Sequence, residues 1–347
     1  MKAKGYAEPV PIFEPLSPLE RSWGRIQPNF VGREPQIKAL MGMARDIVSS
    51  DEPHSRLVFV ASQSGMGKST MVAHAIEHVR NFIGDDTRRL VITKHVGKES
   101  NSLLPFCMFR DILLDVLANF AASTDDKSHA SGVSGFTSSH SISLHSLSCR
   151  SQGSSTALSL AKSEELLKVL CRELAAPSGF VDHVLHYLSG KGAGKSAVGK
   201  APSMKAMVSF MTRAFRRCTQ ETKLVVVALD DVQYIDEMTW KVLRQVFEGC
   251  DNLLLICAFD LSRSRDLKVE SDFWHVLNKK YRPAGHFVPM ELGGLGKEEI
   301  TVMTMKTLGL QREELSPDLL NEILIQSGMS KKRMTVVDVV NVESMVS

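Results

Sequence analysis

Two short segments of the sequence carry residue types that can bind a nucleoside triphosphate and a metal ion. The first, SQSGMGKS at residues 62–69, fits the pattern G-x-x-x-x-G-K-[ST] except at its first position, where Ser62 replaces glycine. Glycines in such a loop let backbone N–H groups converge on phosphate oxygens. Lys68 offers a positive charge for the β- and γ-phosphates, and the Ser69 hydroxyl can ligate Mg²⁺. The alternative is a Gly/Ser loop without a ligand.

The second segment is Asp230-Asp231, which directly follows the apolar run Leu224–Leu229. A buried parallel strand that ends in a carboxylate delivers it to the edge of the sheet where α/β proteins bind ligands. We predict that Asp230 holds Mg²⁺ through water, and that Asp231 orients or deprotonates an attacking water molecule. Gln233 is predicted to position that water or to sense the γ-phosphate. The alternative is a strand followed by an Asp-rich turn.

Strands and helices must place these two segments side by side. Leu57–Ala61 is an unbroken apolar run that predicts a buried strand, and apolar residues recur at helical spacing from Lys68 onward. A strand, a tight loop and a helix in series is the context that a phosphate-binding loop requires. Further buried strands are predicted at residues 90–95, 252–259 and 287–292.

Two more motifs support a family resemblance. The segment Phe30–Glu34 (FVGRE) precedes a helical stretch, and residues 230–239 fit the pattern D-D-x-Q-[WY]-x-D-x-x-[TS]. Together with the phosphate loop, they resemble the Orc1-like AAA ATPase domain of the STAND kind, as found in soluble adenylyl cyclase-like proteins. The resemblance covers residues 29–328. It implies a three-layer α/β P-loop NTPase fold with a mainly parallel sheet, followed by a small helical lid.

The resemblance also implies roles for individual residues. The V-G-R segment is expected to lie along the adenine, and the residues that match L-P-[FY]-x-x-[FW]-R are expected to pack in the core: Leu104, Pro105, Phe106, Phe109 and Arg110. Asp236 is expected to cap the next helix. The predicted nucleotide-binding residues are Val31, Gly32, Arg33, Ser64, Gly65, Met66, Gly67, Lys68, Ser69 and Thr70, with Ser69 and Asp230 as Mg²⁺ ligands and Asp231 and Gln233 as catalytic residues.

Composition and periodicity divide the chain into parts. Residues 1–28 form a Pro-rich leader. Its start resembles the K-G-x-x-E-P-V-x-x-F-E pattern at the end of a class III nucleotidyl cyclase domain, on the residues Lys4, Gly5, Glu8, Pro9, Val10, Phe13 and Glu14; the alternative is a disordered Pro-rich leader. Residues 29–286 are expected to form the ATPase core, with a disordered Ser-rich insertion at 123–163 and a flexible loop at 189–203. Residues 287–347 are expected to form the helical lid, divergent or truncated because the family's Asn-Pro pattern is missing.

A second loop in the chain imitates the phosphate loop. Residues 189–196 (SGKGAGKS) have similar spacing, but Gly199 and Pro202 follow and prevent a regular helix from starting there. We therefore assign phosphate binding to residues 62–69 alone.

Composition narrows the function classes. The chain has 347 residues, 43% of them hydrophobic, and a net charge of +3, which is too small to indicate nucleic acid as a partner. No apolar stretch reaches the length of a membrane span. Six cysteines show no C-x-x-C spacing, which predicts reduced core thiols in a cytoplasmic protein.

We expect an ATP-dependent signalling switch that hydrolyses the β–γ phosphate bond of ATP. It would act on a protein partner or on an attached cyclase domain, and an oligomeric form is an open alternative. The family's Tyr-Arg at the end of the strand 252–259 is replaced by Phe259-Asp260, and a carboxylate there would repel phosphate. That substitution favours the alternative of a nucleotide-binding scaffold without turnover. A third alternative, a DNA-loading ATPase, lacks a helix-turn-helix pattern and a basic stripe.

Overall fold

The computed structural model describes residues 30–52, 54–84, 89–128, 167–174, 176, 184, 202–309 and 311–312. The predictions for the leader 1–28, most of the Ser-rich insertion, the loop 189–201 and residues 313–347 of the expected lid lie outside the described residues. The main helices are α1 (Glu34–Ser49), α2 (Lys68–Ile83), α3 (Cys107–Ser128), α6 (Met204–Thr219), α7 (Glu237–Gly249), α8 (Ser271–Val276) and α9 (Lys297–Leu308). Shorter helical turns are η1 (Glu99–Asn101), η2 (Val232–Tyr234), η3 (Leu261–Asp266) and η4 (Leu277–Tyr281).

Five parallel strands form the central sheet, in the order β2-β3-β4-β1-β5. They are β1 (Arg56–Ser62), β2 (Leu90–Val96), β3 (Leu224–Asp230), β4 (Leu253–Asp260) and β5 (Phe287–Glu291). All five correspond to strands expected from the sequence. The register pairs Ser62 of β1 with Asp260 of β4, and Val96 of β2 with Asp230 of β3. The carboxyl ends of these four strands therefore meet at one edge of the sheet.

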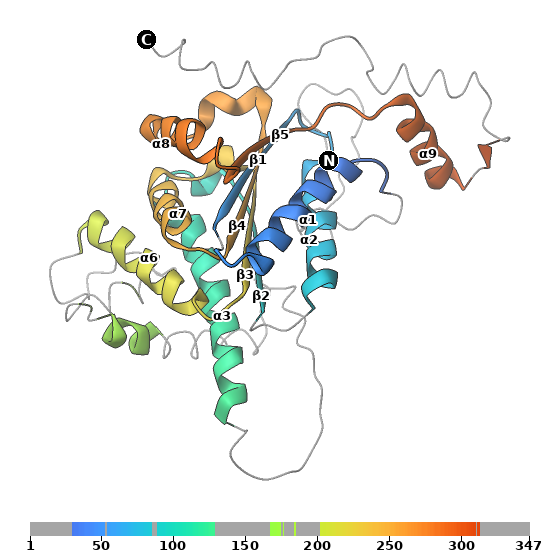
Figure 1. The fold of residues 1–347 in the computed structure, drawn as a ribbon. Helices are drawn as coiled ribbons and strands as arrows, with labels where there is room; N and C mark the ends of the chain where they lie inside the picture. The colour runs from blue at the N-terminus through green and yellow to red at the C-terminus, as the bar shows by residue number, and fades with distance from the viewer. Residues whose placement is uncertain are drawn as a thin grey trace, which may run out of the picture.

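Helices cover both faces of the sheet, which confirms the predicted α/β class (Figure 1). Successive side chains of a strand point to opposite faces. In β1, Leu57, Phe59 and Ala61 pack in a core with residues of α3, α6 and α7, whereas Val58 and Val60 pack against α1 and α2. Both cores are apolar, and burial of apolar area is the main force that holds the three layers together.

Two predicted boundaries differ from the structure. Helix α3 runs to Ser128, so it includes the first residues of the segment 123–163 that was expected to be disordered. A nucleated helix extends at little cost, and α3 therefore continues beyond its apolar stripe. Strand β5 pairs with β1 in the sheet, so the core extends past residue 286, and the helical part of the expected lid begins at α9.

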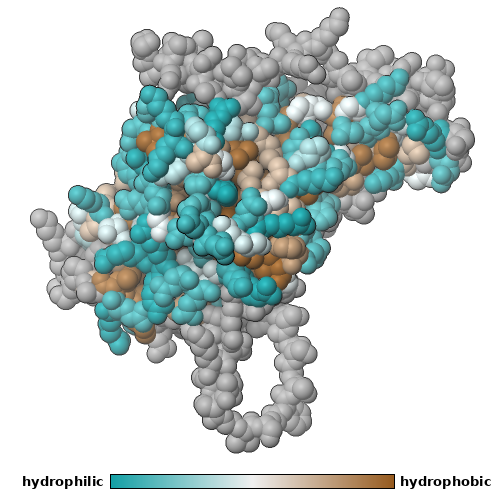
Figure 2. Space-filling view, viewed as in Figure 1, coloured by the Kyte–Doolittle hydropathy of each residue, from teal (hydrophilic) through white to brown (hydrophobic). Residues whose placement is uncertain are grey.

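The face of the molecule seen in Figure 2 is mostly hydrophilic where its residues are coloured, with apolar residues in small groups. None of the described helices has the length and apolar content that a membrane span needs. The described cysteines are unpaired and buried, and burial raises the pKa of the Cys171 and Cys250 thiols to about 11. These thiols match the expectation of reduced core cysteines, while the cytoplasmic location stays a prediction.

Candidate nucleotide-binding site

The predicted phosphate loop connects β1 to α2. Gly65 and Gly67 both have a φ of +82°, a left-handed conformation that side chains with a Cβ rarely adopt. Nothing lies within 4 Å of a Cβ built at either position, so the backbone conformation, and not space, requires glycine. Ser62, the departure from the pattern, is still part of the β1 strand, whose extended backbone does not require glycine. The loop therefore keeps its shape without the first glycine.

Lys68 begins α2 and is buried beneath the loop. Its Nζ donates hydrogen bonds to the carbonyl oxygens of Ser62 and Gln63, each at 3.1 Å. The ammonium group is thus held at the N-terminal end of α2, where the helix dipole also favours an anion. A positive charge and a helix N-terminus at one place are what a phosphate group needs.

The predicted Mg²⁺ ligands lie together although they are 161 positions apart in the sequence. The Ser69 hydroxyl donates a hydrogen bond to Oδ2 of Asp230, at the end of β3. Burial raises the pKa of Asp230, an effect opposed by the hydrogen bond from Ser69 and reinforced by the nearby charge of Asp231. A hydroxyl and a carboxylate are the hard oxygen donors that Mg²⁺ prefers. Among the described residues no group of three or more His, Cys, Asp or Glu could hold a metal ion.

Asp231 has an unusual backbone conformation beside this pair. Its φ of 52° and ψ of 46° lie in the left-handed region, which is uncommon for a residue other than glycine. Its N–H donates to Oδ1 of Asp230 at 3.1 Å, and its own Oδ1 accepts a hydrogen bond from Nε2 of Gln233 at 3.0 Å. Gln233 is buried, and its Oε1 accepts from the backbone N–H of Asp260 at 3.4 Å. The structure thus brings both predicted catalytic residues to the end of β3.

Sequence reasoning missed Gly97, which follows β2. Its N–H donates to the carbonyl oxygen of Asp230 at 2.8 Å, and a Cβ there would collide with the carbonyl oxygen of Asp231. Only glycine lets the end of β2 lie this close to the Asp231 backbone. A glycine directly after a predicted strand was the available signal, and it becomes informative only when the neighbouring strand is known.

The V-G-R segment lies between the phosphate loop and the start of α9. Gly32 has a φ of +77° and abuts Glu299, while Arg33 donates hydrogen bonds to the carbonyl oxygens of Met66 at 3.3 Å and Gly293 at 2.5 Å. Burial lowers the pKa of Arg33, and the Glu299 carboxylate opposes that shift. The structure thus brings this segment to the site, and its contact with adenine stays a prediction.

Asp236 connects two motifs that looked independent in the sequence. Its Oδ1 accepts hydrogen bonds from the N–H groups of Thr239 and Phe106, both at 2.8 Å, and its Oδ2 accepts from the Thr239 hydroxyl at 2.6 Å. The predicted cap of α7 is confirmed. The same carboxylate also fixes Phe106, whose φ is 60°. Phe106 and Phe109 are buried as expected, but the packing role predicted for Leu104 is wrong, because it lies in the loop before α3 and is 56% exposed.

The Asp260 carboxylate at the end of β4, which was expected from the sequence to repel phosphate, is hydrogen-bonded within the protein. Oδ1 of Asp260 accepts hydrogen bonds from the N–H and the hydroxyl of Ser262, so its carboxylate caps η3. Arg263 of η3, an arginine close to the end of β4, lies over the Tyr234 ring and donates to the Tyr234 hydroxyl. Both side chains are therefore engaged within the protein.

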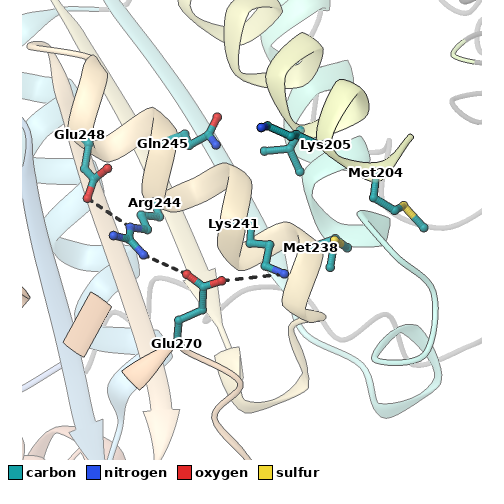
Figure 3. Close-up of a pocket in the computed structure, with 9 residues that line it drawn as sticks. Met204, Lys205, Met238, Lys241, Arg244, Gln245, Glu248 and Glu270 are labelled. Atoms are coloured by element: carbon teal, nitrogen blue, oxygen red, sulfur yellow. Dashed lines mark hydrogen bonds and ion pairs between the residues drawn. The ribbon is translucent and has the colours of Figure 1, made fainter. Parts of the chain in front are cut away.

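A groove between α6 and α7 is separate from this site (Figure 3). Arg244 pairs with Glu248 at 3.2 Å and with Glu270 at 2.9 Å, and Glu270 also lies 3.8 Å from Lys241. These charges neutralise one another, and the groove shares no residue with the phosphate loop or with Asp230-Asp231. The groove is therefore not part of the candidate nucleotide-binding site.

Comparisons with known proteins give a family match. Residues 29–256, more than half of the chain, match the family described as "AAA ATPase domain". A structure of the Aeropyrum pernix ORC2 protein in ADPNP and ADP complexes is 12% identical, with a TM-score of 0.37 over 88% of this chain and 60% of that one. A structure of C. elegans PCH-2 is 11% identical, with a TM-score of 0.33 over 93% of this chain and 61% of that one. This chain thus spans less than two thirds of either structure. Comparison with curated proteins gave no match.

Proposed function

The chain belongs to the AAA ATPase domain family, and from that premise we propose that it binds Mg·ATP at residues 62–69 and hydrolyses the β–γ bond. The observation that supports this most directly is the Ser69 hydroxyl on the Asp230 carboxylate, with Lys68 buried one residue away. Charge, helix N-terminus and oxygen donors thus converge at one loop. Val31, Gly32 and Arg33 are proposed to border the adenine, because they adjoin the same loop.

We assign the residues of the site different roles in binding Mg·ATP. N–H groups of the loop 64–70 surround the phosphates, and the Lys68 ammonium turns from the carbonyls of Ser62 and Gln63 to the β- and γ-phosphates. Ser69 and Asp230 would hold Mg²⁺, Ser69 directly and Asp230 through water. The bound ion would neutralise charge on the phosphate oxygens.

Hydrolysis needs a water molecule aligned with the γ-phosphorus. We assign its orientation to Asp231, whose carboxylate accepts a proton from that water as the oxygen attacks. The bond between the γ-phosphorus and the bridging oxygen breaks, and ADP and inorganic phosphate leave. Asp231 then returns its proton to solvent.

We further propose that the nucleotide state acts as a signalling switch of the STAND kind. Arg33 touches both the phosphate loop, at Met66, and the segment that leads into α9, at Gly293. A change in the loop can therefore move α9, which would signal to a protein partner or an attached cyclase domain. The cyclase part of this proposal rests on the motif resemblance of the leader and of residues 230–239.

The alternative is a nucleotide-binding scaffold without turnover, favoured by Asp260 at the position of the family's arginine. DNA loading is less favoured, because the net charge of +3 gives no strong electrostatic attraction to phosphate backbones.

Binding of a fluorescent ATP analogue tests the site. Lys68→Ala should weaken binding by roughly 10- to 100-fold, because a hydrogen bond to a charged group contributes about 1.5–3 kcal/mol. Lys205→Ala, which removes an exposed lysine on α6, is the matched control and should bind like wild type. Equal affinity of the Lys68→Ala and wild-type proteins would refute the assignment.

Phosphate release separates the switch from the scaffold. Asp231→Asn should slow release by roughly 100-fold or more if Asp231 acts on the water. Identical background rates in the wild-type and Asp231→Asn proteins would favour the scaffold.

A further inference from the structure

Gln233 lies between two groups of the candidate site that differ in chemistry. Its side chain, only 3% exposed, donates from Nε2 to the Asp231 carboxylate and accepts at Oε1 from the Asp260 N–H. We infer that Gln233 is a positioning residue, which fixes the Asp231 carboxylate for the attacking water and ties its orientation to the end of β4. This inference rests on the proposed hydrolysis and adds a means by which it is controlled.

The chemistry of the two neighbours explains why an amide is needed. The Asp260 N–H can only donate a hydrogen bond, and an ionised Asp231 carboxylate can only accept one. A side chain that bridges them must present an acceptor to one and a donor to the other, as an amide does. The two neighbours also fix which way the amide points. Glutamate would place a second carboxylate against Asp231, and methionine offers only a weak acceptor at similar length.

The backbone of Asp231 is fixed by other contacts. A left-handed conformation is strained for a residue with a Cβ, so surrounding contacts must maintain it. Asp230 accepts the Asp231 N–H, and Gly97 lies against the Asp231 carbonyl oxygen. Rotation of the carboxylate is the freedom that these contacts leave, and the hydrogen bond from Gln233 restricts it. The strained backbone of Asp231 and the amide of Gln233 therefore both fix the orientation of the Asp231 carboxylate.

Gln233 is placed to act through Asp231 and not on the nucleotide. Both ends of its amide face protein groups, and the side chain is buried, which differs from the direct contact with water or γ-phosphate expected from the sequence. Asp260 also caps η3 and pairs in register with Ser62, where the phosphate loop begins. A shift of the β4 end is thus transmitted to Asp231 through one side chain.

Steady-state kinetics with ATP tests the inference in the full chain. Gln233→Met should lower kcat by roughly 10- to 100-fold, the effect expected when a catalytic group is misplaced by about 1 Å. The affinity for a fluorescent ATP analogue should stay within about twofold, because no phosphate contact is lost. Gln245→Met is the matched control: Gln245 of α7 accepts a hydrogen bond from Thr212 of α6 and contacts no residue of the candidate site, so this variant should keep the wild-type kcat.

Single-turnover hydrolysis in the Asp231→Asn background distinguishes positioning from an independent role. If Gln233 acts through Asp231, adding Gln233→Met should cause no further loss. A further loss as large as in the wild-type background would overturn the inference, and so would an unchanged kcat in Gln233→Met. Gln233→Glu preserves side-chain size, so full activity in that variant would overturn it even if Gln233→Met does not fold.

The same measurements separate this inference from the proposed function. Wild-type turnover that is insensitive to Gln233 refutes the inference alone. Wild-type protein that binds the analogue and releases no phosphate refutes hydrolysis, and with it the inference.

Discussion

The Asp236→Ala substitution should lower the free energy of unfolding while leaving nucleotide binding intact. The carboxylate accepts three hydrogen bonds, two from Thr239 and one from the Phe106 N–H, and it is 5% exposed. Loss of a helix N-cap costs about 1 kcal/mol. Loss of a charged acceptor for a buried N–H costs about 1.5–3 kcal/mol. We therefore expect the free energy of unfolding to fall by about 2–4 kcal/mol.

Urea unfolding followed by circular dichroism measures this loss. Glu237→Ala is the control: the neighbouring carboxylate is exposed and pairs with Lys241 on the surface, so its removal should cost well under about 1 kcal/mol. Below the unfolding transition, Asp236→Ala should bind the ATP analogue like wild type. A loss of under about 1 kcal/mol, or an intact fold that no longer binds nucleotide, would show that Asp236 is not the structural link between α7 and the start of α3.

Three further changes probe the site. Gly97→Ala should slow phosphate release by about 10-fold or more with little change in analogue affinity, because its Cβ displaces the Asp231 backbone; wild-type release would refute the close contact. Asp230→Asn should raise the thermal midpoint of the nucleotide-free protein at about pH 7, since burial raises the pKa of Asp230 and its ionisation costs stability as pH rises through that value. This gain should shrink towards about pH 4 and be absent if the carboxylate is solvated. Arg33→Met should speed hydrogen exchange in α9, because the link from Met66 to Gly293 is lost; unchanged exchange would refute that coupling.

The strands and the phosphate loop were predictable because their signals are local. An apolar run such as Leu224–Leu229 needs only its own side chains to indicate burial, and the loop pattern fixes glycines where the backbone requires them. The capping role of Asp236 followed from its position before a helix. Boundaries were less predictable, since α3 passes the end of its apolar stripe and β5 is stabilised by pairing with β1, a strand so distant in the chain that no window of sequence contains both.

The remaining contacts of the site depend on neighbours that only folding supplies. Gly97 matters because the end of β2 adjoins Asp231, and Gln233 matters because the end of β4 offers an N–H. Neither fact is visible in the residues that flank these positions. A residue type indicates which hydrogen bonds or charges a side chain can offer, whereas the strand order decides which neighbouring group it contacts.

Asp260 shows how this distinction changes the interpretation of turnover. As a residue type, a carboxylate where the family has an arginine argues against hydrolysis, because it repels phosphate. In the fold, that carboxylate is bound to the N–H and hydroxyl of Ser262, while the Asp260 backbone N–H holds Gln233. What this position supplies to Asp231 is thus a backbone group that any residue other than proline would provide. Asp260→Ala should therefore retain phosphate release within a few fold of wild type, and a large fall or a large gain would show that the carboxylate itself acts on the nucleotide.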